Sequence, residues 1–233
     1  MTKIIDTADN CTSQIVHLQA DIVTTAMRYL TTNTASFKLV SPAEAKALAA
    51  AGIRLGLVFE SGGGAPGQAP LSAAQGAIDG AFAAQYAPTV GAPNGAAIYF
   101  AADNDFSAAQ IKSQVLPYFQ AVVRPITAAG FIVGVYGSGD VCQAVCGAGY
   151  AALAWLSGSV GWSGSRAYLA AKPKELALVQ DVEDTKLADM DVDTDFSLGP
   201  FGDFLPFAPI LTAAPQVATV EAPWYQRILG LHS

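Results

Sequence analysis

Residues 96–105 read AAIYFAADND, an apolar run that ends in two aspartates. The run predicts a buried strand. Asp103 and Asp105 are two residues apart, so their side chains point the same way only if the strand continues through both. A buried carboxylate is unfavourable unless another group pairs with it or uses it. The two acids therefore indicate a sugar-cleaving site, a metal site or the cap of a following helix.

Short apolar runs alternate with Ala-rich helical stretches on both sides of this strand. In residues 41–52, Ser41 is a good N-cap, Pro42 suits the first helical position and Gly52 ends the helix. The predicted helices are 41–52, 72–86 and 107–129, with a further helical stretch from about residue 12 and another that carries Cys142 and Cys146. The predicted strands lie within residues 3–6, 26–30, 53–60, 96–105, 131–139, 150–162 and 174–181.

This alternation, with short connections, is the signature of an α/β fold with parallel strands. Seven strands are clear, and we expect one more between Ser157 and Lys172. The count favours a (β/α)8 TIM barrel over an open doubly wound sheet, and the short chain predicts that some helices are reduced. We expect residues 1–199 to form the barrel. Residues 200–233 are spaced by prolines and predict an extended C-terminal tail, which docks on a partner, self-associates or covers the barrel's own surface.

Composition and local motifs exclude several classes of protein. The 233 residues are 52% hydrophobic and 13% charged, with a net charge of −7 and no stripe of Lys or Arg, so nucleic-acid binding is not expected. The glycine-rich residues 61–70 lack the GK[ST] ending of a phosphate-binding loop. No apolar run reaches membrane-spanning length, and residues 1–10 lack the apolar core of a signal peptide.

Neither cysteine nor histidine indicates a catalytic or metal centre. Cys142 and Cys146 are four residues apart, so we expect them to share a helix face and pack there, and packing is also the prediction for Cys11. The histidines, His17 and His232, give no basis for a Ser-His-Asp or Cys-His mechanism. We expect no metal and no cofactor.

The acidic residues 191–195, DVDTD, superficially resemble a calcium loop. They lack the central Gly and terminal Glu of an EF-hand. We therefore interpret this segment as a solvated acidic turn.

Acidic and aromatic residues recur where the predicted strands end. In a parallel barrel, the carboxyl ends of the strands form the active-site face. Carboxylates beside aromatic rings suit sugars, which stack an apolar face on a ring and present hydroxyls at the edge. The residues at these strand ends are Asp6, Glu60, Asp103, Tyr136, Trp155 and Gln180.

Several motifs resemble one known family. They are IDTADNCT at 5–12, RYL at 28–30, the helix–strand unit at 41–60, IYFAADND at 98–105, GVYGS at 134–138 and AWLSGS at 154–159. Together, from about Ile4 to Asp195, they resemble the DUF1906 family, a glycoside hydrolase-like domain. The resemblance implies a TIM barrel related to the family 25 muramidases, which cleave the glycan strand of peptidoglycan.

The resemblance also implies roles for individual residues. The acid that ends the first strand of the muramidases matches Asp6. Their Asp-x-Glu motif, in which Glu is the general acid, matches Asp103-Asn104-Asp105, so Asp105 stands in place of Glu and reaches less far. Glu60, at the neighbouring strand end, is a candidate to take over as the acid. Acids near the last muramidase strand have weaker matches in Asp181 and residues 192–195.

We therefore expect a glycosidase that acts on peptidoglycan or a related glycan, with no membrane span. The alternative is a non-catalytic glycan-binding or structural barrel of a cell-wall or phage assembly. The localisation is undetermined; we expect a cytoplasmic protein that reaches the cell wall after lysis or through a dedicated export system. The predicted catalytic residues are Asp6, Glu60, Asp103 and Asp105, and the predicted substrate-binding residues are Arg28, Tyr99, Tyr136, Trp155, Gln180 and Asp181.

Overall fold

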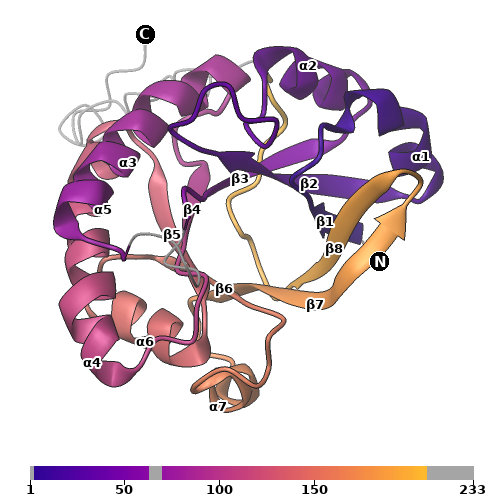
Figure 1. Ribbon diagram of the computed structural model, residues 1–233. Helices are drawn as coiled ribbons and strands as arrows, with labels where there is room; N and C mark the ends of the chain where they lie inside the picture. Colours follow the sequence, from indigo (N-terminus) through magenta and orange to yellow (C-terminus); the bar gives the residue numbers. More distant parts are fainter. Residues whose placement is uncertain (1–2, 63–69, 209–233) are drawn as a thin grey trace, which may run out of the picture.

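The computed structural model describes residues 3–62 and 70–208. Within them, eight strands close into a barrel in chain order, with helices on the outside (Figure 1). The TIM-barrel-like α/β fold predicted from the sequence is therefore confirmed. The strands are β1 (Lys3–Asp6), β2 (Val23–Leu30), β3 (Arg54–Phe59), β4 (Ala97–Ala101), β5 (Ile132–Gly137), β6 (Leu153–Leu156), β7 (Leu176–Leu187) and β8 (Met190–Ser197).

The eighth strand lies later in the chain than predicted, and it is antiparallel rather than parallel to its neighbours. Strands β1 to β7 pair in parallel, whereas β8 is antiparallel to both β7 and β1. The strand expected between Ser157 and Lys172 is wrong, since helix α7 (Ser165–Ala171) lies there. The interpretation of residues 191–195 as a solvated turn is also wrong, because they lie within β8. Only a two-residue turn separates β7 from β8, and a connection that short can only join antiparallel strands.

The helices follow the predicted ends closely. Ser41 caps α2 by accepting from the Glu44 N–H at 3.1 Å, and the predicted helix 107–129 forms with one π-helical segment inside it. The helices are α1 (Ile15–Ala20), α2 (Pro42–Ala50), α3 (Ala73–Tyr86), α4 (Ala108–Gln110), α5 (Leu116–Ala128), α6 (Gly139–Gly147) and α7, with the 3-10 turns η1 (Cys11–Gln14) and η2 (Ala87–Val90) and the π segment η3 (Ile111–Val115). None of the helices in the described ranges is long and apolar enough to span a membrane.

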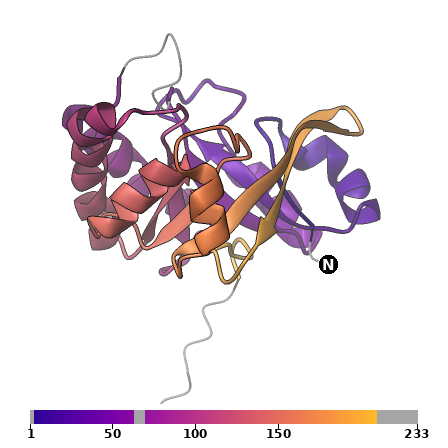
Figure 2. The same ribbon diagram turned by 90° about the horizontal axis from the view of Figure 1, so that it is seen from below.

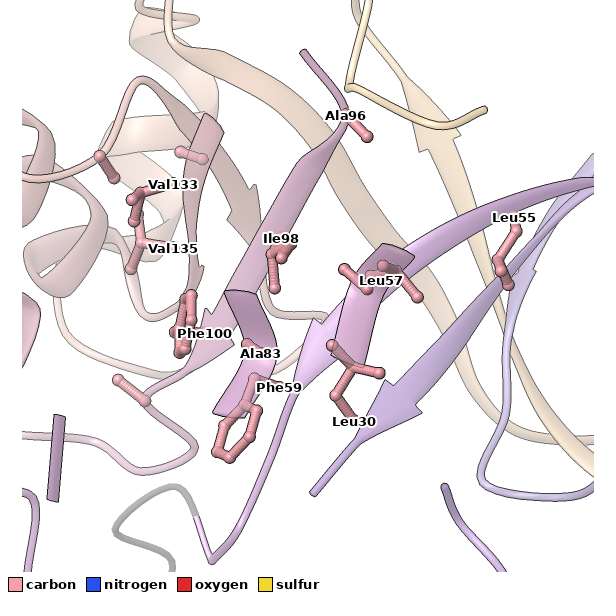
Figure 3. Close-up of a cluster of buried hydrophobic side chains, with 14 of the residues drawn as sticks. Leu30, Leu55, Leu57, Phe59, Ala83, Ala96, Ile98, Phe100, Val133 and Val135 are labelled. Atoms are coloured by element: carbon pink, nitrogen blue, oxygen red, sulfur yellow. The ribbon is translucent and has the colours of Figure 1, made fainter. Parts of the chain in front are cut away.

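Side chains that alternate along each strand build two cores. The outward-facing set, which includes Leu57, Phe59, Ile98 and Phe100, packs under the helices, here against Ala83 of α3 (Figure 3). The inward-facing set fills the barrel. Its members are Ile4, Met27, Val58, Ala97, Tyr99, Ala101, Trp155, Ala177, Leu178 and Phe201.

The segment that follows β8 seals the amino end of the barrel. It crosses the barrel as the yellow chain in Figure 1, placing Phe201 in the inner core and pairing Phe204 with Leu55 of β3. Asp203 adds an ion pair with Arg54 at 2.5 Å. The first residues of the predicted tail thus cover the barrel's own surface, while residues 209–233 lie outside the described ranges.

The hairpin of β7 and β8 extends past the ends of the neighbouring strands (Figure 2). No helix of the described chain follows β7 or β8, so the hairpin takes the place of the last two helices of a (β/α)8 barrel. It forms one wall of the barrel's carboxyl mouth.

Candidate active site

A pocket of about 230 Å³ opens at the carboxyl mouth of the barrel. It brings together six of the predicted site residues, Asp6, Glu60, Asp103, Tyr136, Trp155 and Gln180. It also contains residues that were not predicted, namely Tyr29, Ser159, Trp162, Glu183 and Asp184, together with Asp193 from the weaker candidates at 192–195.

Gln180 organises the floor of this pocket. Its Nε2 donates to Asp6 Oδ2 at 3.1 Å and to Asp193 Oδ2 at 2.8 Å. Its Oε1 accepts from the Gly158 N–H at 3.1 Å and from the Tyr136 hydroxyl at 2.9 Å. A backbone N–H can only donate, so the amide orientation is fixed. Every hydrogen-bonding position of Gln180 is thus occupied within the protein, and it holds two carboxylates that face each other across β1 and β8.

The floor carboxylates have strongly perturbed acidities. Burial, followed by the charge of Asp193, raises the pKa of Asp6 from 3.8 to about 7, although hydrogen bonds from Gln180 and Tyr29 act in the opposite direction. Burial, followed by the charge of Asp6, raises the pKa of Asp195 well above its usual value. Asp195 Oδ1 accepts from the Trp155 indole N–H at 2.8 Å. At neutral pH the floor therefore holds protons that exposed aspartates would have lost.

A second acidic pair lies at the ends of β3 and β4. The Glu60 carboxylate forms an ion pair with Lys38 at 3.6 Å. Within the described residues, the Asp103 carboxyl accepts no hydrogen bond. Burial, followed by the charge of Glu60, raises the pKa of Asp103 above 3.8. A carboxyl with a raised pKa beside an ion-paired carboxylate is an arrangement suited to acid–base catalysis.

Aromatic rings line the pocket between these acids. Tyr136 and Trp155 pack edge to face at 4.8 Å between centroids, and Tyr99 supports Trp155 from below at 5.8 Å in the same geometry. Trp162, on the loop before α7, completes the lining. The pocket thus offers apolar surfaces beside hydrogen-bond acceptors.

The β7–β8 hairpin aims two consecutive acids into the pocket. Neighbouring residues on a regular strand face opposite sides, yet both Glu183 and Asp184 line the pocket. The β7–β8 register shifts between Val182 and Thr185, and Asp184 has a positive φ of 54°. The Asp184 N–H donates to Asp193 Oδ1 at 2.7 Å and fixes this irregularity. A bulge of this kind re-aims side chains next to active sites.

Arg28 and Asp181, which were predicted to bind substrate, do not line the pocket. Each is a sequence neighbour of a residue that does, and alternation along the strand turns it to the other face. Arg28 is fully buried, its Nε pairs with Glu44 at 2.7 Å, and its Nη1 donates to the Thr7 carbonyl. Asp181 is exposed on the outside of β7.

Tyr99 and Asp105 are also placed elsewhere. Tyr99 points into the barrel but lies below the pocket, where its hydroxyl donates to the Phe201 carbonyl at 2.9 Å. Strand β4 ends at Ala101, so Asp105 lies beyond the strand, exposed to solvent, and accepts from the Ser163 N–H at 2.8 Å. The expectation that Asp103 and Asp105 form the central pair is therefore corrected, and Asp103 has Glu60 as its neighbour instead.

Strand alternation could have found Tyr29 and could have singled out Asp193 within residues 192–195. Tyr29 is two residues from the inward-facing Met27, and Asp193 is two residues from the inward-facing Asp195. Residues 192–195 were weak candidates for acids near the last strand, and β8 now supplies Asp193 and Asp195 to the floor. Glu183 and Asp184 both point into the pocket because of the bulge in β7, and no feature of the sequence predicts that bulge. Among the described residues, no three His, Cys, Asp or Glu side chains are arranged to hold a metal ion.

Comparison with known proteins agrees with this architecture. The family model of the Rv2525c-like, glycoside hydrolase-like domain matches residues 16–193. The chain belongs to this family. FadG of Bacillus subtilis (strain 168), an uncharacterized protein, is 28% identical over 147 residues, which are 60% of this chain but only 25% of FadG.

Solved structures of other proteins share the barrel, and two of them illustrate the likeness. The Tat-secreted protein Rv2525c of Mycobacterium tuberculosis matches with a TM-score of 0.71 at 22% identity, over 87% of this chain and 98% of that one. The catalytic domain of endolysin ply40, from bacteriophage P40 of Listeria monocytogenes, matches with a TM-score of 0.53 at 16% identity, over 84% and 92%. At these identities the likeness concerns the fold of the family domain.

Proposed function

We propose that this chain hydrolyses glycosidic bonds of peptidoglycan or a related glycan. The observation that carries the proposal is the pairing of Asp103 with Glu60 in an aromatic-lined pocket. Membership of a glycoside hydrolase-like family supports it, as does the fold shared with an endolysin catalytic domain.

In this mechanism Asp103 is the general acid. Its proton passes to the glycosidic oxygen as the bond from that oxygen to the anomeric carbon breaks. The Glu60 carboxylate stabilises the positive charge that develops on the sugar. Water then supplies a hydroxyl to the anomeric carbon and returns a proton to Asp103, so that one water is consumed per bond cleaved. Asp6 lies at the floor of the same pocket, where it contacts the sugar.

The aromatic lining gives the proposal its substrate class. A sugar ring places C–H groups on the face of an indole or phenol ring and directs its hydroxyls to acceptors at the edge. Trp162 and Tyr136 provide such rings, and the acceptors are the carboxylates of Glu183 and Asp184.

Release of reducing ends from purified peptidoglycan tests the proposal. Wild type is expected to release them, and Asp103→Asn is expected to lose about 10²-fold or more of that rate, the usual contribution of a general acid. Asp21→Asn is the matched control, since Asp21 is an exposed aspartate that pairs with Lys3 away from the mouth. Equal rates for Asp103→Asn and wild type would refute the assignment of the acid.

A non-catalytic glycan-binding barrel is the second candidate, favoured by the exclusion of Asp105 from the pocket. Asp105 matches the general acid of the muramidases, and it lies in solvent instead. If no reducing ends are released, although the folded protein retains peptidoglycan in a pull-down, the binding function is correct.

A further inference from the structure

A second cavity of about 280 Å³ adjoins the pocket. It lies between the β2–α2 loop, the end of β1 and the β7–β8 hairpin. The two cavities share Asp6, Tyr29, Asp184 and Asp193. The two cavities therefore adjoin each other at these four residues, and their volumes are similar.

Phe37 lines this second cavity, and the fold does not explain its presence there. Its side chain is 68% exposed, and it belongs to neither of the two cores. A large apolar side chain that is mostly exposed and lies outside the cores is informative when it lines a cavity.

The loop that carries Phe37 is fixed rather than free. The Val40 N–H donates to the Tyr29 carbonyl at 3.0 Å, and Leu39 forms an isolated bridge with Tyr29. Lys38, the next residue after Phe37, lies over the Tyr29 ring at 5.5 Å and pairs with Glu60 in the first pocket. Phe37 is thus presented at a defined position on the rim.

The opposite side of the second cavity offers acceptors for hydroxyl groups. Asp184 stands at the junction of the two cavities, and no hydrogen bond or ion pair within the described residues engages its carboxylate. By contrast, Asp9 already accepts from the Asp191 N–H at 3.0 Å, so it holds the hairpin to the rim. The exposed Phe37 ring and the Asp184 carboxylate line the same cavity, and a pyranose has an apolar face for the ring and hydroxyls for the carboxylate.

We propose that the second cavity binds the adjacent sugar unit of the same glycan, stacked on Phe37 and hydrogen-bonded to Asp184. This subsite rests on the proposed function, because it adjoins the same pocket. It predicts that the protein engages a chain of sugars rather than a single residue, and that affinity grows when the chain is long enough to reach Phe37.

Calorimetric titration with N-acetylglucosamine oligosaccharides tests the subsite. The titrations use the Asp103→Asn protein, which is expected not to cleave the ligands, with N-acetylglucosamine itself, its disaccharide and longer oligomers as ligands. Phe37→Ala is expected to weaken binding of the disaccharide and the longer oligomers roughly two- to tenfold, as a lost aromatic contact does, and to leave binding of the single sugar unchanged. Phe37→Trp is expected to retain the affinity. The control is Phe196→Ala, another exposed phenylalanine, on the outer face of β8.

The outcomes separate this subsite from the proposed hydrolysis. The subsite would be overturned if Phe37→Ala lowers the affinity equally for ligands of every length, or does not lower it at all. It would also be overturned if no oligomer binds. Length-dependent loss would support it even if the wild-type chain releases no reducing ends, a result that counts against hydrolysis alone.

Discussion

Gln180 and Asp6 are joined by a hydrogen bond of 3.1 Å whose direction the protein fixes, since the Gly158 N–H leaves Gln180 Oε1 only the role of acceptor. The second amide hydrogen of Gln180 goes to Asp193, the residue that faces Asp6 across the β1–β8 ladder. One neutral side chain therefore stabilises negative charge on two opposed acids. Gln180, which was predicted to bind substrate, lines the pocket and has its amide hydrogen-bonded to the acids of the floor.

Replacement of Gln180 by Met is expected to raise the pKa of Asp6 further above about 7. A hydrogen bond to a charged group contributes about 1.5–3 kcal/mol, so the midpoint should move up by about one pH unit or more. The groups that face Asp6 from other elements, Asp193, Asp195 and Tyr29, remain in place. Carboxyl carbon NMR of Asp6 measures the titration.

Gln75→Met is the matched control for this titration. Gln75 Nε2 donates to Asp79 Oδ1 at 2.7 Å, so the same kind of amide–carboxylate contact is removed outside the pocket. The Asp6 midpoint should not change in that variant. An unchanged Asp6 midpoint in Gln180→Met would show that the amide does not stabilise the charge.

Stability is expected to fall as pH rises through the acid range into the neutral range. Asp6 has its pKa raised from 3.8 to about 7 by folding, so between these values the folded state holds a proton that the unfolded state has released. The free energy of unfolding then decreases by up to roughly 1.4 kcal/mol per pH unit from this group, and the loss is complete above about pH 7. Asp6→Asn removes the titrating group, so its unfolding free energy should depend less on pH in this window. Urea denaturation at a series of pH values measures this, and identical slopes for the two proteins would contradict it.

Asp105→Asn is expected to retain the rate of reducing-end release. The Asn carbonyl oxygen can still accept from the Ser163 N–H, so the local contact is preserved while the acid is lost. The sequence comparison alone predicts the opposite, because Asp105 matches the muramidase acid. A loss at Asp105→Asn as large as that at Asp103→Asn would mean that Asp105 reaches the substrate when the glycan binds.

Strand alternation explains how much of this site could be predicted from the sequence. Apolar runs that end in acids indicated the barrel and its mouth, and they located Asp6, Glu60 and Asp103 correctly in the pocket. On β2, the same alternation places Tyr29 on the face that points into the barrel and Arg28 on the opposite face. On β7, it likewise places Gln180 in the pocket and Asp181 on the outer face.

Two features could not be predicted in this way. The eighth strand carries alternate acids, Asp191, Asp193 and Asp195, and so has the composition of a solvated turn rather than of a barrel strand. Two of these acids are acceptable inside the barrel because Gln180 and Trp155 donate hydrogen bonds to them. The bulge that aims both Glu183 and Asp184 inward likewise depends on a register shift that only pairing with β8 creates.

Arg28→Met tests whether Arg28 holds the structure or binds the glycan. The ion pair with Glu44 is completely buried, and removal of the arginine leaves the Glu44 carboxylate with its hydrogen bonds from Cys11 and Asn10 but without a counter-charge. An unpaired buried charge costs about 3–5 kcal/mol, so the free energy of unfolding should fall by that amount in urea denaturation. The double variant Arg28→Met/Glu44→Gln should recover part of the loss, because it removes the stranded charge. If Arg28→Met instead keeps the wild-type stability and weakens glycan binding, Arg28 belongs to the substrate site after all.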